Sequence, residues 1–414
     1  MRYKITHAPK RLHGTINLPA SKSISNRLVI INALCAEHIT VGNLSRSGDT
    51  QIIEQLIVSD SETLDVGQAG AAMRFLTAYF SIKQGVTKIL TGSDRMKERP
   101  IGILVEALRK LGAEIDFLER EGYPPLRITG KQLNGCEISV TGNVSSQFIT
   151  GLLLTAPTLA NGLIINIEGK ITSMPYINMT LSMMNYFGVT ARLENSIITV
   201  NHGIYAAMPY DVEPDWSSAS YWYSMAALSQ EADIFLPGLK EFSIQGDSVV
   251  ASIFTLFGVH TEFSEKGVRI TKQGKPATEF GYDFTDCPDL AQTVITTSAA
   301  LRIPGVFTGL ESLRIKETDR VTALKNELKK MGTQLKEISY GRVKLIPGTE
   351  LIGSNLPGLL FQTYQDHRMA LSFTPLSILY GDIIISDPEV VEKSYPHFWQ
   401  DLKSVGFIVE KKYD

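Results

Sequence analysis

A short pattern that occurs five times along the chain constrains its fold more than any other feature. In each copy an amphipathic helical stretch ends on an apolar residue, a glycine follows, and a strand-like run comes next, as in ALRKLGAEIDF. A glycine after a helix supplies the left-handed conformation that lets the chain reverse. The spacings of 76, 70, 74 and 74 residues predict duplicated helix-and-sheet units of about 70 residues. The glycines are Gly112, Gly188, Gly258, Gly332 and Gly406.

The first unit is predicted to be shorter than the others. A sixth copy of the pattern is expected near residue 38 or somewhat after it, but the sequence there, DTQIIEQLIVSDSETL, has no glycine followed by a strand. Helix, glycine and strand also follow one another in many unrelated α/β proteins, and only the even spacing of five copies favours duplication. Pro214 separates a strand-like run from a helix-like run and indicates a crossover between two domains.

Composition excludes several classes of protein. A chain of 414 residues suggests two or three domains, and 43% hydrophobic residues exclude bulk disorder. A net charge of −3 argues against a general nucleic-acid binder. We expect no membrane span, because no apolar run is long enough, and no signal peptide. Cys35, Cys136 and Cys287 lie far apart and form no zinc or disulfide pattern, which suits a reducing compartment. These features together predict a cytoplasmic enzyme.

Three segments in the first half place cations, hydroxyls or glycines at or near helix starts. In LPASKSISNRL, Lys22 opens a helix, and Ser23 and Arg27 share a face four residues apart, which is typical of an anion site. In VGQAGAAMRFL, Gly70 allows a close approach of the backbone, although tight helix packing explains it as well. Arg99 in SDRMKERPIG also fits a solvated loop, so none of these segments is decisive alone.

Short hydrogen-bonding side chains stand in a row in NVSSQF (143–148). Ser145, Ser146 and Gln147 suit a phosphate or a polyhydroxylated ring, but a plain turn is an equal alternative.

The second half of the chain contributes further cations. In LRIKETDRVTAL, we predict that Lys316 and Arg320 share one face at a helix start, beside Glu317. A repulsive pair of cations on one face is relieved by an anionic ligand. In YQDHRMAL, Asp366 is predicted to cap a helix whose first turn holds His367 and Arg368, where cations are favoured if they face an anion. His367 could instead be a structural histidine without a role in binding.

One acid stands where proton transfer is expected. Asp289 in CPDLAQT follows a proline at an apolar helix start, and apolar surroundings raise the pKa of a carboxyl group. The alternative is an ordinary acid in a first helical turn. Lys393 in VVEKSYPHF is a further cation. The lysines and arginines of all these segments together are too many for a single carboxylate. They suit two anionic substrates, at least one of them phosphorylated. No motif of metal ligands accompanies them, so fixed cations would neutralise the charge.

Taken together, these segments resemble the family of 5-enolpyruvylshikimate-3-phosphate synthase (EPSP synthase). The matching segments run in the family's order from residue 18 to beyond Lys393 and cover nearly the whole chain. They are LPASKSISNR, GQAGAAMRFLTA, LTGSDRMKERPIG, GNVSSQFITGLLL, SMPYINMTL, SSASYW, CPDLAQT, RIKETDR and TYQDHRMAL.

The resemblance implies a two-domain α/β fold, an inverse α/β prism built from repeated βαβαββ units. It implies one domain from residues 1–20 with 214–414, another from residues 21–213, and an active site in the cleft between them that closes over the substrates. It also implies a monomer that needs no metal or other cofactor and has no nucleic-acid or membrane partner.

The family transfers the enolpyruvyl group of phosphoenolpyruvate to the 5-hydroxyl of shikimate 3-phosphate and releases phosphate, in the pathway to chorismate and the aromatic amino acids. The resemblance implies that Asp289 accepts the hydroxyl proton and that Glu317 and Lys22 serve the proton steps at the methylene carbon. The implied ligands of shikimate 3-phosphate are Lys22, Ser23, Arg27, Ser145, Ser146, Gln147, Ser173, Tyr176, Asp289 and Lys316. Those of phosphoenolpyruvate are Lys22, Gly70, Arg99, Gln147, Glu317, Arg320, Arg368 and Lys393.

The chain departs from the family pattern in its glycine loop. Gln68 and Ala71 stand where the family usually has Asn and Thr, and Phe75 stands where many members have Pro. These positions adjoin the glycine at which glyphosate competes in the family, so the inhibitor sensitivity of this chain is open. Pro214 and Trp216 replace smaller residues near the domain crossover.

Two other functions compete with this interpretation. The sister family, UDP-N-acetylglucosamine enolpyruvyl transferase, shares the fold and the donor, but it usually carries a cysteine in the loop that aligns with SDRMKERP, and this loop has none. A catalytically silent protein that binds phosphorylated metabolites is the second alternative. The retention of Asp289, Glu317 and Lys22 argues against it.

Overall fold

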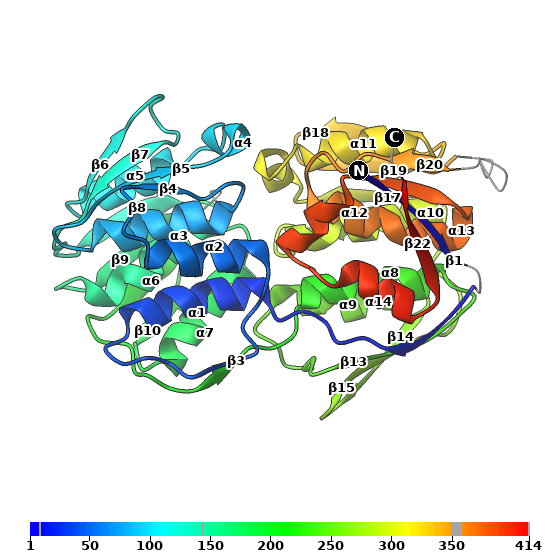
Figure 1. Cartoon of the computed structure of the whole chain (residues 1–414), viewed down its shortest axis with the longest axis horizontal. Coiled ribbons are helices and arrows are strands. Elements are labelled where there is room, and N and C mark those ends of the chain that lie inside the picture. Colours follow the sequence, from blue (N-terminus) through cyan, green and yellow to red (C-terminus); the bar gives the residue numbers. More distant parts are fainter. Residues whose placement is uncertain (8–9, 143–144, 349–357, 413–414) are drawn as a thin grey trace. The chain divides into compact units, whose positions relative to one another are not determined.

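The computed structural model describes residues 1–7, 10–142, 145–348 and 358–412. The chain folds into two compact units, one of Met1–Pro19 with Glu213–Asp414 and the other of Ala20–Val212 (Figure 1). We call them the C-terminal unit and the N-terminal unit. Each boundary lies one residue before the one predicted from the sequence.

One sheet topology recurs in both units. Among the described residues, five four-stranded sheets each have a first strand parallel to the second, a third strand antiparallel to the second, and a fourth antiparallel to the third. In four of these sheets the third and fourth strands form a hairpin, whereas in the fifth they come from opposite ends of the chain. In the N-terminal unit the sheet orders are β4-β5-β7-β6 and β8-β9-β11-β10. The strands are β4 (Thr63–Asp65), β5 (Thr87–Thr91), β6 (Glu114–Phe117), β7 (Leu126–Thr129), β8 (Glu137–Thr141), β9 (Leu163–Glu168), β10 (Ala191–Glu194) and β11 (Ile197–Val200).

The first repeat unit is shortened, as the sequence predicts. Here β3 (Val41–Gly42) pairs in parallel with β12 (Tyr210–Asp211), and among the described strands the two form a two-stranded sheet. The chain from β3 enters α2 (Gly48–Ile57) and then β4, without the hairpin that completes the two four-stranded sheets of this unit.

The C-terminal unit holds three of the four-stranded sheets, and the chain's first two strands complete two of them. Strand β1 pairs antiparallel with both β21 and β22, and β2 pairs in parallel with β13. Residues 1–19 therefore belong to this unit although they precede the other one in the sequence. The strands are β1 (Arg2–His7), β2 (Arg11–Thr15), β13 (Glu231–Pro237), β14 (Val259–Ser264), β15 (Gly267–Lys272), β16 (Tyr282–Asp283), β17 (Gly305–Thr308), β18 (Gln334–Ser339), β19 (Arg342–Ile346), β20 (Leu359–Phe361), β21 (Ile383–Ser386) and β22 (Phe407–Lys412).

The five repeated glycines lie between a helix and an edge strand, as the pattern predicts. Their φ angles run from 73° to 101°, the left-handed region in which a side chain would be strained. Each glycine follows one helix of the set α5 (Gly102–Lys110), α7 (Met174–Tyr186), α9 (Val250–Thr255), α11 (Arg320–Lys329) and α14 (Phe398–Ser404). The strands that come next are β6, β10, β14, β18 and β22.

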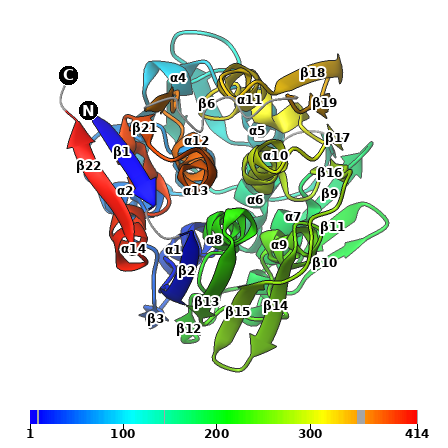
Figure 2. The ribbon, with the colours of Figure 1, turned by 90° about the vertical axis from the view of Figure 1, so that its right-hand side faces the viewer.

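A second set of helices forms the centre of each unit. They are α1 (Lys22–Leu34), α3 (Gly70–Ser81) and α6 (Ser146–Thr155) in the N-terminal unit, and α8 (Trp216–Leu228), α10 (Ala291–Ala300) and α12 (His367–Phe373) in the C-terminal unit. Figure 2 looks along α8, α10 and α12, with the sheets of the C-terminal unit around them. Every residue of α3, α10 and α12 is buried.

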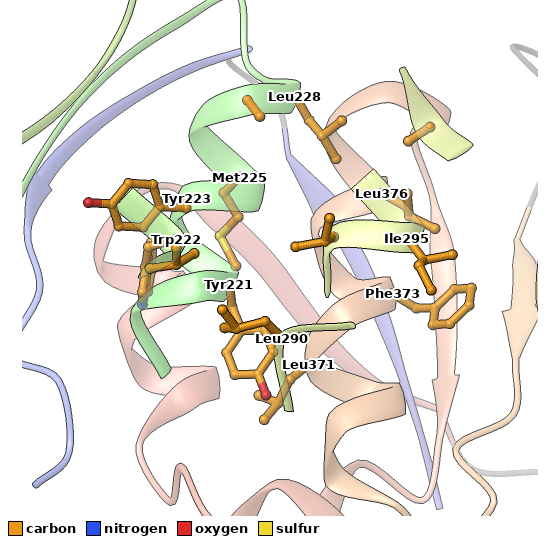
Figure 3. Close-up of a cluster of buried hydrophobic side chains, with 14 of the residues drawn as sticks. Tyr221, Trp222, Tyr223, Met225, Leu228, Leu290, Ile295, Leu371, Phe373 and Leu376 are labelled. Atoms are coloured by element: carbon orange, nitrogen blue, oxygen red, sulfur yellow. The ribbon is translucent and has the colours of Figure 1, made fainter. Parts of the chain in front are cut away.

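Small and hydroxyl side chains allow the central helices to approach one another. In the C-terminal unit, Ser224 and Thr297 are 2.7 Å apart, and Thr293 and Ser372 are 3.1 Å apart, so hydrogen bonds join α8 to α10 and α10 to α12. Apolar side chains of the same helices form the core beside them, among them Trp222 (Figure 3). The remaining described helices are α4 (Asp94–Lys97), α13 (Ser377–Tyr380) and the 3-10 turns η1 (Ala156–Thr158), η2 (Gly246–Val249), η3 (Pro288–Leu290), η4 (Glu311–Ile315), η5 (Thr374–Leu376) and η6 (Pro388–Lys393).

Candidate active site

In the N-terminal unit, the first predicted cluster lies at the start of α1. Lys22 opens the helix, and its Nζ lies 3.4 Å from Oδ2 of Asp49. Arg27 Nη1 donates to the carbonyl of Ser23 at 2.7 Å, which confirms that residues 23 and 27 share a face. The Arg27 guanidinium also donates to Thr180 Oγ1 at 2.8 Å and to Thr150 Oγ1 at 3.2 Å.

Arg27 is a buried cation held by neutral groups. Its acceptors are the two threonine hydroxyls and the carbonyls of Ser23 and Tyr176. The Phe75 ring, one of the departures from the family pattern, lies 5.9 Å from the guanidinium carbon. Burial lowers the pKa of Arg27 to about 10, although the side chain still carries its charge at neutral pH. A buried positive charge among neutral acceptors favours the arrival of an anion.

Gly70 begins α3 and lies against the guanidinium of Arg99. A β-carbon on Gly70 would be 2.6 Å from Nη2 of Arg99, closer than two such atoms can approach. Arg99 follows α4 and is buried. On the next turn of α3, Arg74 donates to the carbonyls of Gly70 and Pro100. The glycine therefore leaves room for a closely packed neighbour, and that neighbour is a cation rather than another helix.

Hydroxyl groups begin α6 and precede α7. Ser145 accepts a hydrogen bond from the backbone N–H of Gln147 at 3.3 Å and so caps α6, of which Ser146 is the first residue. Residues 143–144 of the same motif lie outside the described residues. Ser173 precedes α7 with a φ of 57°, in the left-handed region. The Tyr176 carbonyl, one turn on, accepts from Arg27, which brings this segment to the same cluster.

In the C-terminal unit, Arg320 is the centre of a buried network of charges. Its guanidinium donates to Asp366 at 2.7 Å, to Asp289 at 3.0 Å and to Glu317 at 2.9 Å. The side chain is 2% exposed. Burial alone would lower the pKa of Arg320, but the charges of Asp366, Glu317 and Asp289 outweigh it and raise the pKa. Arg320 therefore stays charged and fixes three carboxylates.

Asp289 lies between cations rather than in the apolar surroundings that the sequence predicts. Its Oδ1 is 3.0 Å from Arg320 Nη1 and 3.9 Å from Lys316 Nζ, and its Oδ2 is 2.8 Å from Arg368 Nη2. The apolar run after Asp289 is the buried helix α10, whereas the carboxylate extends from η3 toward residues brought by other elements. The expectation of an apolar setting is wrong for this reason.

Lys316 and Arg320 both contact Asp289, but they do not share a helical face as predicted. Asp319 accepts from the backbone N–H of Thr322 at 3.0 Å and caps α11, so the helix begins at Arg320. Lys316 ends η4 with extended backbone. Glu317, between them, binds Arg320 and also accepts from Lys393 Nζ at 2.8 Å.

The cap predicted at Asp366 is confirmed. Asp366 Oδ1 accepts from the backbone N–H of Arg368 at 2.9 Å, and α12 begins at His367. Arg368 reaches beyond Asp289 to the hydroxyl of Tyr221, at 3.1 Å. Burial raises the pKa of Tyr221 to about 12, with the charge of Arg368 acting in the opposite direction.

Two residues of this network escape sequence reasoning. Tyr221 looks like one more aromatic residue of an apolar helix. Asp247, in η2, is buried, and the hydroxyl of Ser217 donates to its Oδ2. Burial, and then the charge of Asp289, raise the pKa of Asp247 to about 7, whereas Arg368 and the Ser217 hydrogen bond lower it. Its sequence context, SIQGDSVV, carries no signal that separates it from an ordinary acidic turn.

Each unit thus gathers its own set of predicted residues. The N-terminal unit brings Lys22, Ser23, Arg27, Gly70, Arg99, Ser145, Ser146, Gln147, Ser173 and Tyr176 to the starts of its helices or the segments beside them. The C-terminal unit joins Asp289, Lys316, Glu317, Arg320, Arg368 and Lys393 in one network of ion pairs. Across the described part of the chain, no group of three or more metal-ligating side chains could hold a metal ion. No described helix is both long enough and apolar enough to cross a membrane.

The sequence model of EPSP synthase (3-phosphoshikimate 1-carboxyvinyltransferase) matches residues 6–59 and 50–402 of this chain. The chain belongs to the EPSP synthase family. A 3-phosphoshikimate 1-carboxyvinyltransferase of Bacteroides fragilis is 48% identical over 408 residues, which are 98% of each chain. The enzyme of the same name from a Sulfurovum species is 36% identical and covers 97% of this chain and 99% of its own.

The family fold is also found in solved structures. EPSP synthase from Acinetobacter baumannii superposes with a TM-score of 0.80 at 22% identity, over 99% of this chain and 100% of its own. The two-unit α/β fold predicted from the sequence is therefore confirmed as that of EPSP synthase.

Proposed function

We propose that this protein, as an EPSP synthase, transfers the enolpyruvyl group of phosphoenolpyruvate to the 5-hydroxyl of shikimate 3-phosphate and releases phosphate. The observation that carries the proposal is the position of Asp289, a carboxylate within 3.0 Å of both Arg320 and Arg368. This arrangement unites a proton acceptor with two fixed cations, as the reaction of two anionic substrates requires.

Charge neutralisation is the first task of such a site. Each substrate carries a phosphate and a carboxylate, whose mutual repulsion opposes the approach of the reacting carbons. We assign Arg320, Arg368 and Lys393 to phosphoenolpyruvate, with Lys22, Gly70, Arg99, Gln147 and Glu317. Arg320 and Arg368 are already oriented by Asp366, Asp289 and Tyr221, so they need little reorganisation when the substrate binds.

The acceptor substrate requires cations together with hydroxyl and amide groups. We assign shikimate 3-phosphate to Lys22, Ser23, Arg27, Ser145, Ser146, Gln147, Ser173, Tyr176, Asp289 and Lys316. The buried Arg27 supports this assignment, because a guanidinium among neutral acceptors gains the most from an added anion. Residues of both units then serve one reaction.

The chemistry is an addition followed by an elimination. A proton is added to the methylene carbon of phosphoenolpyruvate, the 5-hydroxyl oxygen bonds to C2, and the hydroxyl loses its proton to Asp289. The tetrahedral intermediate then loses a proton from the new methyl group while the C2–O bond to phosphate breaks. We assign the proton steps at this carbon to Glu317 and Lys22. Glu317 is 9% exposed and bonded to Lys393, which holds it in place for transfer.

The free cysteines suit a reducing compartment, and we propose that the protein acts in the cytoplasm. We also propose that it acts as a monomer, as the family resemblance implies.

Phosphate release tests the function directly. The purified protein is given phosphoenolpyruvate with either shikimate 3-phosphate or UDP-N-acetylglucosamine, without added metal. We expect release with shikimate 3-phosphate alone. Release only with the nucleotide sugar would establish the sister activity. Release with neither, by protein that is shown to be folded, would refute both and favour a binding protein.

A further inference from the structure

The turn that leads into α12 has an unfavourable backbone. Residues 362–365 connect β20 to the Asp366 cap, and we call them the 362–365 turn. Tyr364 and Gln365 have φ angles of 54° and 57°, in the left-handed region that residues with a β-carbon rarely adopt. Two such residues in succession persist only where the surrounding structure holds them, and they occur preferentially at functional sites.

A buried carboxylate holds this turn. Glu327 lies on α11 and is 1% exposed. Its Oε2 accepts from the backbone N–H of Gln362 at 3.0 Å, and its Oε1 accepts from the Tyr364 hydroxyl at 2.8 Å. Lys330 Nζ neutralises it at 2.6 Å and donates to the Leu360 carbonyl at 2.9 Å. Burial, and then the bond to Glu327, raise the pKa of Tyr364, so its hydroxyl keeps its proton.

The 362–365 turn positions Asp366, and Asp366 orients the cations Arg320 and Arg368. The backbone N–H of Asp366 donates to the Thr363 carbonyl at 2.9 Å. The Asp366 carboxylate binds Arg320 at 2.7 Å and caps the helix at Arg368. Arg320 and Glu327 are seven residues apart on α11 and so lie on one face of that helix. Helix α11 therefore binds the chain around Asp366 at two points, through Glu327 before the cap and through Arg320 at the cap itself.

We propose that Glu327 and Tyr364 are positioning residues for the phosphoenolpyruvate site. They hold the 362–365 turn in its left-handed conformation and thereby set Asp366, Arg320 and Arg368 in the directions that bind the donor substrate. The inference rests on the proposed function, because it uses the assignment of Arg320 and Arg368 to phosphoenolpyruvate. Neither Glu327 nor Tyr364 touches a group to which a step of the reaction is assigned.

Three variants of the full chain test the proposal. Tyr364→Phe removes one hydroxyl and keeps the ring, Glu327→Ala removes both acceptors, and Glu327→Gln keeps one oxygen for the Gln362 N–H. We expect KM for phosphoenolpyruvate to rise about threefold in Tyr364→Phe and roughly tenfold in Glu327→Ala, with Glu327→Gln milder than Glu327→Ala. KM for shikimate 3-phosphate is expected to stay within about twofold in Tyr364→Phe, because most residues assigned to this substrate belong to the N-terminal unit and keep their positions.

Two controls make the result specific. Tyr340→Phe removes the same hydroxyl from an exposed tyrosine of the same unit and is expected to leave both KM values unchanged. Arg368→Lys tests the underlying assignment and is expected to raise KM for phosphoenolpyruvate. The positioning role is wrong if Arg368→Lys raises KM for phosphoenolpyruvate but Tyr364→Phe and Glu327→Ala do not. It is also wrong if Tyr364→Phe and Glu327→Ala lower the melting temperature and change neither KM. An equal rise for both substrates in Tyr364→Phe would also overturn it. If wild-type protein is inactive or Arg368→Lys has no effect, the proposed function or its assignment fails instead.

Discussion

Gly70 and Arg99 are packed so closely that a β-carbon on Gly70 would lie 2.6 Å from the Arg99 Nη2. The group that must move is the end of a flexible side chain, so the displacement costs little stability but changes where the guanidinium points. We expect Gly70→Ala to raise KM for phosphoenolpyruvate roughly tenfold, while the free energy of unfolding changes by less than about 1 kcal/mol. Steady-state kinetics and urea unfolding measure the two effects.

The matched control for this prediction is Gly203→Ala. A β-carbon at this position meets no described atom within 4 Å beyond those of its two chain neighbours. Both KM values should remain those of the wild type. A normal KM for phosphoenolpyruvate in Gly70→Ala would show that Arg99 does not contribute to binding this substrate.

Asp289→Asn tests the proton acceptor. The amide keeps the size of the side chain but cannot take a proton, so we expect kcat to fall by about 10²–10⁴-fold while both substrates still bind. Asp286→Asn, the same substitution at an exposed position three residues earlier, should keep full activity. Retention of kcat in Asp289→Asn would assign the hydroxyl proton to another group.

Asp247 makes stability depend on pH. Its pKa is about 7 in the folded protein and 3.8 as an isolated side chain, so between these values the folded state binds more protons than the unfolded state. The contribution of Asp247 is therefore present below about pH 4 and is lost as pH rises to about 7. Asp247→Asn cannot ionise. We expect this variant to gain about 3 kcal/mol of unfolding free energy relative to wild type between pH 5 and pH 8.

Urea unfolding at the two pH values measures this gain. Asp233→Asn is the control, because the hydrogen bond from Arg269 lowers the pKa of Asp233, and its contribution is lost only as pH falls below the usual carboxyl range. The difference between Asp233→Asn and wild type should be the same at pH 5 and pH 8. A similarly constant difference for Asp247→Asn would mean that Asp247 is already ionised at pH 5.

Arg320→Gln should destabilise the protein strongly. It leaves Asp289, Glu317 and Asp366 without their shared cation, and removing one partner of a buried network costs about 3–5 kcal/mol. Arg269→Gln removes one partner of an exposed Arg–Asp pair in the same unit and should cost far less, because solvent screens the pair. Equal losses in the two variants, measured by urea unfolding, would contradict the structural importance of the buried network.

Local rules in the sequence predict much of the architecture. The five glycines each lie at a left-handed position between a helix and a strand, because only the last helical turn and the next residue decide that conformation. The Asp366 cap is equally local. Helix capping also explains why the prediction for Lys316 and Arg320 is wrong. Asp319 caps the helix, so Lys316 lies before its start, and an aspartate at this position is a capping signal that can be read from the sequence.

Contacts between distant segments were not predictable in this way. Glu327 and Asp247 stand in ordinary surroundings in the sequence, and their roles come from partners on other elements, 35 residues away for Gln362 and 30 for Ser217. Tyr221 and Arg368 are 147 residues apart and meet because α8 packs with α12. No local pattern reports such a pair.

The sequence by itself determined the repeated units, the helix starts and the types of side chain at each start, since these depend on neighbours a few residues apart. Only the tertiary structure decided that Asp289 lies among cations from α11, α12 and the end of η4, rather than in an apolar pocket. The reason is physical: the surroundings of a carboxylate are set by the side chains that packing brings to it, and here they come from positions up to 79 residues away in the sequence.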